Sequence, residues 1–213
     1  MNAPASIPKQ PRNCRRRFFR AAYYFFLTAA VLALGYSTYV VVDARAYQAI
    51  ERSRLSRMRP AQGVRVVEEG DVIGEMSIPR LGLKTIVAQG DSSKVLRRAV
   101  GHLRETPLPG EPGNVALAGH RDGFFRPLRN IRLGDRISLN TLDGEFLYQV
   151  ESTEVVGPSE VRVLQSSREN TLTLVTCFPF HYVGAAPKRF IVHARQIGRL
   201  PAESTMAEAP GHF

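Results

Sequence analysis

A run of 22 residues without a charged side chain, Ala21–Val42, constrains this chain more than any other feature of its sequence. As an α-helix the run would extend about 33 Å, enough to cross a bilayer hydrocarbon core about 30 Å thick. Tyrosines lie near both ends, where amphipathic rings favour the membrane interface. A cleaved signal peptide is the alternative, but its apolar region usually has only about 7–15 residues. The sequence therefore predicts an uncleaved transmembrane anchor over residues 21–42.

Basic residues gather directly before this anchor. Residues 1–20 contain six Lys or Arg side chains and no acid, in a chain whose net charge is +10. Without these six, the chain carries 23 basic against 19 acidic residues. Such an asymmetry is typical of a cytoplasmic tail that fixes membrane topology rather than of a nucleic-acid-binding surface. We therefore expect a single-pass protein with its N-terminus in the cytoplasm and everything after Val42 outside it.

The segment from about residue 69 to residue 199 has the pattern of short β-strands. Asp143-Gly144 separates two alternating runs, which is a strong hairpin signal, and little of the segment has helical spacing. Many short strands with Gly and Pro turns indicate a mainly all-β domain, either an antiparallel barrel or a sandwich. Residues 43–68 are interpreted as a stalk, and residues 200–213 as a flexible tail. Strands are expected at 71–78, 83–88, 114–118, 136–140, 145–156, 171–176 and 189–194, with short helical turns at 93–98 and 124–128.

Cys177 is the candidate nucleophile. The chain has two cysteines, and Cys14 falls on the predicted cytoplasmic side of the anchor. A lone cysteine in an exported domain has no disulfide partner, so it is either a small buried apolar residue or a reactive thiol. Cys177 ends an apolar β-run and is followed by Phe178-Pro179, where the chain must leave the strand. That position beside a loop favours the reactive thiol.

A thiol nucleophile needs a proton partner, because only a few per cent of a free thiol is ionised at neutral pH. His120 leads on position, since it follows the apolar run VALAG and precedes Arg121-Asp122-Gly123. His102 and His181 remain alternatives. Two further histidines are less favoured, one inside a predicted strand and one in the tail, namely His193 and His212.

An acyl-transfer site also needs hydrogen-bond donors for the oxyanion. Arg189 begins the strand RFIVHAR, twelve residues beyond Cys177, and its guanidinium offers a permanent charge with a fork of donors. Lys188 and Arg195 are the alternatives. An antiparallel pairing of the two strands would bring Cys177 and Arg189 to the same end of the domain.

No metal or cofactor motif is evident. The acids Glu154, Glu160 and Glu169 flank the loop 157–170, but they lack the regular spacing of a calcium loop. The sequence contains no phosphate-binding loop, no G-x-G-x-x-G and no His-Glu-x-x-His. We therefore expect that no cofactor is required, and calcium stimulation has no support from the spacing.

Five blocks of sequence, in order, resemble those of sortases, the membrane-anchored cysteine transpeptidases of bacterial surfaces. The pentapeptide TLVTC at residues 173–177 is similar to the TLxTC motif of that family. Residues 118–121 (AGHR) resemble the segment with the family histidine, and residues 187–190 (PKRF) the segment with the family arginine. Similarity extends to residues 73–81 and 108–114, and the residues after Cys177 are most like the class D type.

The resemblance implies an eight-stranded sortase β-barrel with a few short helices behind one N-terminal transmembrane helix. It also implies that Cys177 is the nucleophile, His120 the acid/base and Arg189 the oxyanion or substrate clamp. The implied reaction cleaves an LPxTG-like C-terminal sorting signal of an exported protein through a thioacyl intermediate. An amine then accepts the acyl group, either from a cell-wall peptide or from a pilin lysine. The implied location is the bacterial cytoplasmic membrane.

Substrate contacts are expected beside these three residues and in the loop 157–170. Within that loop Val161, Val163 and Leu164 could form a wall that receives the Leu-Pro of the motif, although an ordinary surface connection fits as well. Thr176 and Ala118 complete the predicted substrate contacts. The main alternative function is a catalytically silent, membrane-tethered scaffold that binds sorting signals. A thiol redox protein is disfavoured because the exported part has no resolving cysteine.

Overall fold

The computed structural model describes residues 12–55, 67–166, 168–182 and 184–201. The chain divides into two compact units, one ending at Asp43 and the other beginning at Ala44. The predicted cytoplasmic tail and C-terminal tail therefore lie largely outside the described residues, as does the second half of the predicted stalk. The proposed division into tail, anchor, stalk, barrel and tail remains a prediction.

The first unit contains most of a single long helix, α1 (Arg12–Leu55). One helix of the described residues is long and apolar enough to cross a membrane, and it is this one. Its large apolar side chains are exposed all around the axis, including Phe26, Leu32 and Tyr36. A helix that is apolar on every face suits lipid rather than water, so the helical form of the predicted anchor is confirmed.

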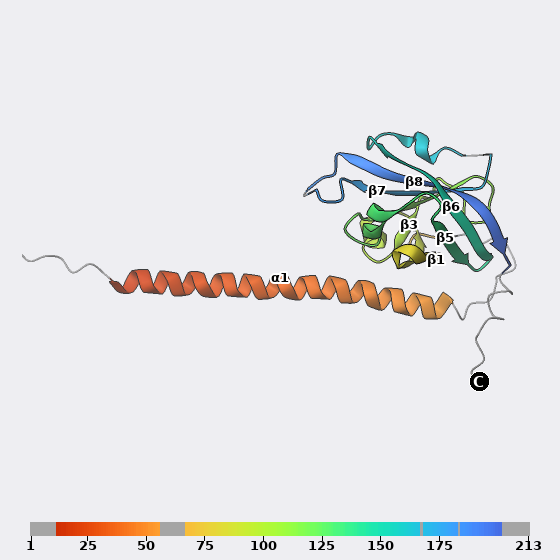
Figure 1. Cartoon of the computed structure of the whole chain (residues 1–213). Coiled ribbons are helices and arrows are strands. Elements are labelled where there is room, and N and C mark those ends of the chain that lie inside the picture. The colour runs from red at the N-terminus through yellow and green to blue at the C-terminus, as the bar shows by residue number, and fades with distance from the viewer. Residues whose placement is uncertain (1–11, 56–66, 167, 183, 202–213) are drawn as a thin grey trace, which may run out of the picture. The chain divides into compact units, whose positions relative to one another are not determined.

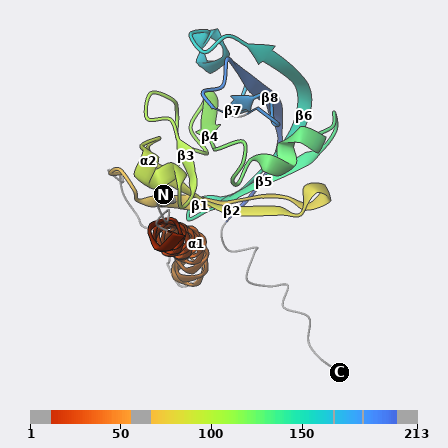
Figure 2. The same cartoon turned by 90° about the vertical axis from the view of Figure 1, so that its left-hand side faces the viewer.

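The second unit is a closed barrel of eight strands, in the order β1-β2-β3-β4-β7-β8-β6-β5. Figure 2 shows β7 and β8 on the side of the barrel away from β1 and β2. The strands are β1 (Val72–Ile78), β2 (Leu83–Gln89), β3 (Val100–His102), β4 (Asn114–Ala118), β5 (Arg136–Thr141), β6 (Gly144–Val156), β7 (Thr171–Phe178) and β8 (Lys188–Leu200). The barrel and its strand number confirm the fold that the resemblance implied.

The helical content of the barrel is small. From residue 67 onward, the described part of the chain has α2 (Ser93–Leu96) and three 3-10 turns, η1 (Pro79–Leu81), η2 (Arg126–Asn130) and η3 (Val161–Leu164). Ser92 caps α2, since its hydroxyl accepts a hydrogen bond from the Val95 amide. The structure adds one strand that was not predicted, the three-residue β3. Several predicted strands are longer in the structure, and β8 differs most, since it runs from Lys188 to Leu200 where 189–194 was expected.

Alternating side chains of the strands fill the barrel interior. On β6, for example, Phe146, Tyr148 and Val150 are buried and the residues between them are half-buried or exposed. This alternation is the sequence pattern that predicted strands. The same cluster contains residues of the other strands, among them Met76, Ile78, Val115, Leu117, Ile137, Leu139, Leu172, Leu174, Val192 and Ala194.

Two kinds of strand pairing position the functional end of the barrel. β7 and β8 form an antiparallel hairpin, whereas β4 and β7 run parallel although 57 residues separate their paired positions Asn114 and Thr171. Figure 1 shows β7 and β8 side by side, with the loop that joins them at one end of the barrel. The ends of β4 and β7 and the start of β8 therefore lie next to one another.

Candidate active site

Cys177 is the penultimate residue of β7 and pairs in register with Arg189, the second residue of β8. It is the one free cysteine among the side chains that the structure describes, and it is half-buried. β7 ends at Phe178, and Pro179 has no amide hydrogen to continue the ladder. The hairpin thus presents the thiol and the guanidinium from adjacent positions on neighbouring strands.

His120 reaches the same level from the other side of β7. In the parallel β4–β7 pair, Ala118 lies opposite Val175, and the Gly119 amide donates to the Val175 carbonyl at 3.1 Å. The Thr176 hydroxyl donates to the Gly119 carbonyl at 2.7 Å. His120 lies two residues past Ala118, and Cys177 lies two residues past Val175. The register of β4 with β7 therefore places His120 and Cys177 at the same height along the barrel. The His120 side chain is exposed.

Gly119 allows the chain to turn at this point. A Cβ atom there would lie 2.7 Å from Cδ2 of Phe125, a fully buried core side chain that cannot move away easily. The chain after Gly119 folds back in a tight turn, in which the amides of Gly123 and Phe125 both donate to the His120 carbonyl at 3.1 and 3.2 Å. Glycine is therefore required next to the histidine for packing and not for a left-handed backbone.

The guanidinium of Arg189 contacts the backbone of its own loop. Its Nη1 donates to the carbonyls of Ala186 at 3.3 Å and Lys188 at 3.1 Å. Lys188 is exposed and pairs with Phe178, so it lies at the same end of the barrel. Arg195 pairs with Thr171 at the opposite end of β7 and binds Glu151 at 2.6 Å. Of the three basic candidates, Arg189 lies directly opposite Cys177 in the strand pair, Lys188 is one position away, and Arg195 is at the far end.

The remaining histidines have different surroundings. His102 is buried, and its ring nitrogens contact Gln89 Oε1 at 2.8 Å and the Pro107 carbonyl at 2.9 Å. Burial lowers the pKa of this imidazole, because the charged form loses hydration. We interpret His102 as a structural residue that ties β3 to β2 and to the loop after β3.

Two more histidines lie on the outside of the barrel. His181 is exposed in the β7–β8 loop, four residues past Cys177, and therefore stays near the thiol. His193 lies within β8 at the level of Thr173, where its Nε2 contacts Glu154 Oε1 at 3.0 Å. Its position excludes contact with the Cys177 end of the strand. His212 and the side chain of Cys14 lie outside the described part of the chain.

The predicted substrate contacts in the β6–β7 loop are not equivalent. Val161 is 69% exposed, whereas Val163 is only 7% exposed and packs with Val156 and Ile191. Leu164 is half-buried against the same cluster. Only Val161 therefore presents an open apolar surface, and the role of the loop as a substrate wall remains a prediction.

The other two predicted substrate contacts, Thr176 and Ala118, lie at the ends of β7 and β4. Thr176 is only 2% exposed, and its hydroxyl donates a hydrogen bond to the Gly119 carbonyl. Ala118 is half-buried at the end of β4. The arrangement gives Thr176 a role in holding β4 to β7, while contact of either residue with a substrate remains a prediction.

Polar side chains fasten the β6–β7 loop to the barrel. The Asn114 amide Nδ2 donates to the carbonyls of Val163 at 3.1 Å and Gln165 at 3.3 Å, and its Oδ1 accepts from the Thr173 hydroxyl at 2.8 Å. Arg162 binds Glu154 at 2.6 Å and Glu160 at 3.1 Å. The Arg162 hydrogen bond and then that of His193 lower the pKa of Glu154. Two of the acids considered for calcium are thus bound to an arginine.

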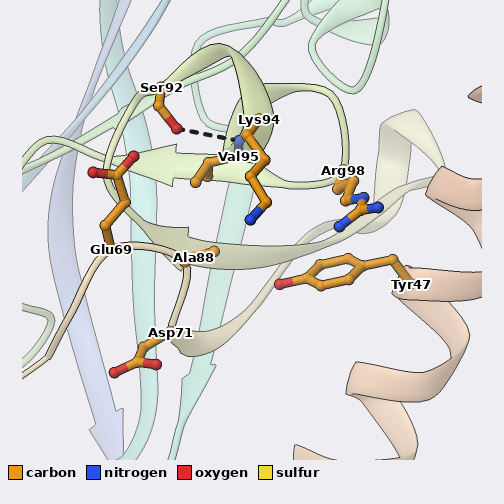
Figure 3. Close-up of a pocket in the computed structure, with 9 residues that line it drawn as sticks. Tyr47, Glu69, Asp71, Ala88, Ser92, Lys94, Val95 and Arg98 are labelled. Atoms are coloured by element: carbon orange, nitrogen blue, oxygen red, sulfur yellow. Dashed lines mark hydrogen bonds between the residues drawn. The ribbon is translucent and has the colours of Figure 1, made fainter.

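Pockets lie at different places on this unit. A pocket of about 600 Å³ lies beside the segment after Cys177 and is lined by Arg129, Asn130, Phe178, Pro179, Phe180, His181 and Tyr182. Figure 3 shows a second pocket, of about 550 Å³, which contains none of the predicted site residues. Charged residues of both signs line it, among them Glu69, Asp71 and Lys94. The first pocket is therefore the one adjacent to the thiol.

Taken together, the end of three neighbouring strands carries a thiol, an imidazole and a guanidinium. A thiol can attack a carbonyl carbon, an imidazole can move the proton, and a guanidinium can stabilise the negative oxygen. The geometry is suited to nucleophilic acyl transfer. Among the described residues, no group of three or more His, Cys, Asp or Glu side chains is arranged to hold a metal ion.

Comparison with known proteins agrees with this arrangement. The family model described as "Sortase domain" matches residues 76–197. Sortase D of Bacillus subtilis (strain 168) is 28% identical over 190 residues, which cover 81% of this chain and 96% of that protein. The structure of a Clostridium perfringens sortase D5 transpeptidase superposes with a TM-score of 0.57 at 35% identity, covering 62% of this chain and 83% of the other.

Proposed function

The chain belongs to the sortase family, and from this premise we propose that it is a cysteine transpeptidase whose nucleophile is Cys177. One observation carries the proposal. The register of β7 with β8 and with β4 places Cys177 beside Arg189 and level with His120 at one end of the barrel. A domain that only bound peptides would need none of the three groups in this arrangement.

In the proposed reaction, the substrate is an LPxTG-like C-terminal sorting signal of an exported protein. The Cys177 sulfur attacks the carbonyl carbon of the scissile bond, commonly Thr–Gly, and a tetrahedral oxyanion forms. As this intermediate collapses, His120 donates its proton to the leaving amine and a thioester remains on Cys177. An incoming amine then attacks the thioester and transfers its proton to His120, and Cys177 leaves as the thiolate, which restores the thiolate and imidazolium that began the reaction.

Arg189 is proposed to stabilise the oxyanion in both steps. Its described hydrogen bonds use Nη1, which leaves the Nε–H and the Nη2 hydrogens for the substrate. The carbonyls of Ala186 and Lys188 also hold the guanidinium in place, so less of its conformational freedom is lost on binding. Loss of a single oxyanion donor typically lowers the rate about 10²–10³-fold.

The proposed location follows from the apolar helix and from the charge that precedes it. With the basic tail in the cytoplasm, the barrel faces the side on which exported proteins present their C-terminal signals. The acceptor amine would then come from a cell-wall peptide or from a pilin lysine. The membrane itself is the third proposed partner, through residues 21–42.

Intact-mass measurement on the full chain in detergent micelles tests the proposal. A panel of LPxTG-like peptides and a small primary amine is added, and peptide mapping locates any acyl adduct. We expect an adduct on Cys177 and an amine-capped peptide product from the wild-type chain, and neither from the folded Cys177→Ala variant. Capped product from Cys177→Ala would exclude this nucleophile. A folded wild-type chain that forms no adduct with any peptide, although iodoacetamide modifies Cys177, would favour a binding scaffold.

A further inference from the structure

Arg121, the residue after His120, crosses from the His120 turn to the β7–β8 loop. Its Nη1 donates to the Pro179 carbonyl at 3.1 Å, and its Nη2 donates to the carbonyls of Tyr182 at 2.7 Å and Gly184 at 2.9 Å. The guanidinium carbon also lies 5.8 Å from the centroid of the Tyr182 ring. One planar cation thus binds three carbonyls of the loop that joins Cys177 to Arg189.

The strand ladder itself does not hold these two segments together. The last contacts of β4 with β7 are the bonds of the Gly119 amide to Val175 and of the Thr176 hydroxyl to Gly119. Beyond them, the chain turns away at His120 on one side and at Pro179 on the other. Among the described hydrogen bonds, those of Arg121 are the ones that connect the His120 turn, residues 120–125, to the β7–β8 loop.

We propose that Arg121 is a positioning residue that fixes the His120 imidazole relative to the Cys177 thiol. Its backbone is continuous with that of His120, and its side chain is bound two to seven residues past the thiol. The inference rests on the proposed roles of Cys177 and His120. Arg121 acts through those two residues and touches no reacting atom in this arrangement.

The chemistry of the contact requires arginine. Guanidinium presents its donors in a rigid plane that can reach several acceptors at once, and charge-assisted bonds are stronger than neutral ones. Lysine keeps the charge but places three donors on one atom. The three carbonyls lie at a part-exposed site, where water can replace a lost donor. Loss of Arg121 should therefore alter geometry much more than stability.

Kinetics of variants separate positioning from binding and from charge. A displacement of about 1 Å between reacting groups can cost about 10²-fold in rate. We expect Arg121→Gln and Arg121→Lys each to lower kcat for transpeptidation about 10- to 100-fold, with the KM for the sorting peptide changed less than about 3-fold. Arg126→Gln removes the same charge from an exposed residue of the same loop and is the matched control. We expect it to retain wild-type kcat.

Three kinetic outcomes would overturn the proposal. Wild-type kcat in Arg121→Lys would show that charge suffices and that the fork is not needed. A rise in KM with unchanged kcat would make Arg121 a substrate-binding residue. An equal loss in Arg126→Gln would attribute the effect to the local charge.

Hydrogen exchange of the full chain tests the Arg121 clamp, meaning the hydrogen bonds of Arg121 to residues 179–184, without any peptide substrate. The amides of Gly123 and Phe125 donate to the His120 carbonyl, and the amide of the following residue, Arg126, donates to the Gly123 carbonyl. We expect both Arg121 variants to accelerate their exchange, while exchange in the β7 ladder and in Arg126→Gln stays as in the wild type. If exchange is faster in both Arg121 variants but the wild-type chain processes no peptide, the Arg121 clamp is supported and the proposed function is refuted. Unchanged exchange in both variants would refute the clamp.

Discussion

His120 is the residue whose role can be separated most directly from that of its neighbours. Proton transfer by a positioned side chain typically contributes about 10²–10⁴-fold to the rate, so His120→Ala should lower kcat/KM by at least about 100-fold. His181→Ala should lower it much less, because His181 is in the exposed loop and outside the register that aligns Cys177 with His120. Steady-state transpeptidation of both variants measures this, and the reverse order of losses would identify His181 as the base.

The shape of the guanidinium is the basis of the second prediction. Arg189→Lys keeps the charge but loses the fork of donors, so we expect kcat to fall about 10²–10³-fold. Lys188→Gln is the matched control, since Lys188 is exposed at the same end of β8. Single-turnover formation of the thioacyl adduct is the appropriate measurement. Full activity of Arg189→Lys, or an equal loss in the control, would remove Arg189 from the oxyanion role.

At the scale of residues, the sequence predicted the members of the candidate site but ranked the histidines on weak local signals. Both His102 and His120 follow a glycine, and His120 is favoured locally only by its place between an apolar run and Arg121-Asp122-Gly123. The difference is tertiary, since Gln89 and Pro107 surround His102 and leave it buried. Arg121 was not singled out, because its acceptors at 179–184 lie 58 to 63 residues away in sequence.

Among the elements, the β6–β7 loop is tied to the start of β4 by the buried side-chain amide of Asn114. Asn114→Ala removes the donor to Val163 and Gln165 and the acceptor that lies 2.8 Å from the Thr173 hydroxyl, so we expect a loss of about 1–3 kcal/mol of unfolding free energy. If the loop is the substrate wall, the KM for the sorting peptide should also rise. Gln165→Ala is the control, because only its backbone carbonyl takes part. A KM unaffected by Asn114→Ala would indicate an ordinary surface connection.

The contact between η1 and the start of β5 predicts a pH dependence of stability. Asp135 is buried and accepts hydrogen bonds from Arg80 Nε, from Arg80 Nη2 at 2.6 Å and from the Arg132 amide at 2.8 Å. The Arg80 hydrogen bond lowers the pKa of Asp135 below its usual 3.8. A lowered folded pKa stabilises the protein above the unfolded value, and this stabilisation disappears as the pH falls through the folded value.

Thermal unfolding of Asp135→Asn measures that contribution. At pH 5–6 we expect the variant to be less stable than the wild type by about 1–2 kcal/mol, discounted because Arg80 is partly exposed. The difference should shrink as the pH falls below about 3.8, where the carboxylate of the unfolded wild-type chain takes up a proton, and should disappear below the lower pKa of the folded state. Asp143→Asn, at an exposed turn, should show no such trend. A difference that stays constant down to pH 2 would exclude this linkage.

Most elements could be predicted, because alternation of apolar residues is a local property. The errors have physical reasons. β3 has only three residues, too few for alternation to be visible, and it exists through its pairing with β2 and β4. Asp143-Gly144 predicted the β5–β6 hairpin, yet Gly144 pairs with Thr141 and the two turn residues are Leu142 and Asp143. The cross-strand register, which is not local, decides the position of the turn.

At the scale of the whole molecule, the apolar helix predicts how the chain partitions. Replacing Val31 and Leu32 with arginine places two charges near the middle of residues 21–42, and each costs about 2.5–3.5 kcal/mol on insertion scales. We expect the double variant to leave the membrane fraction on carbonate washing. The matched control, Val31→Ile with Leu32→Met, should remain in it. Retention of both chains would contradict anchoring by this segment.

Closure of the barrel was the part least accessible from composition and spacing. The residues alone were compatible with a barrel or a sandwich, and only the family resemblance selected between them. Closure depends on pairings between distant strands, such as β1 with β5 and β6 with β8. The resemblance carries that long-range information because the ordered motifs belong to one known topology.

The parallel pairing of β4 with β7 has a consequence for the timing of activity during folding. The paired positions are separated by 57 residues, and β5, β6 and their loops lie between them. Contacts of such high sequence separation form late, because the entropy of loop closure must be overcome first. In a nascent or translocating chain, Cys177 is therefore not yet aligned with His120, its proposed acid partner. With the proposed roles and location, reactivity would appear only once the barrel has folded outside the membrane, which would protect the cell from an enzyme that acts before it arrives.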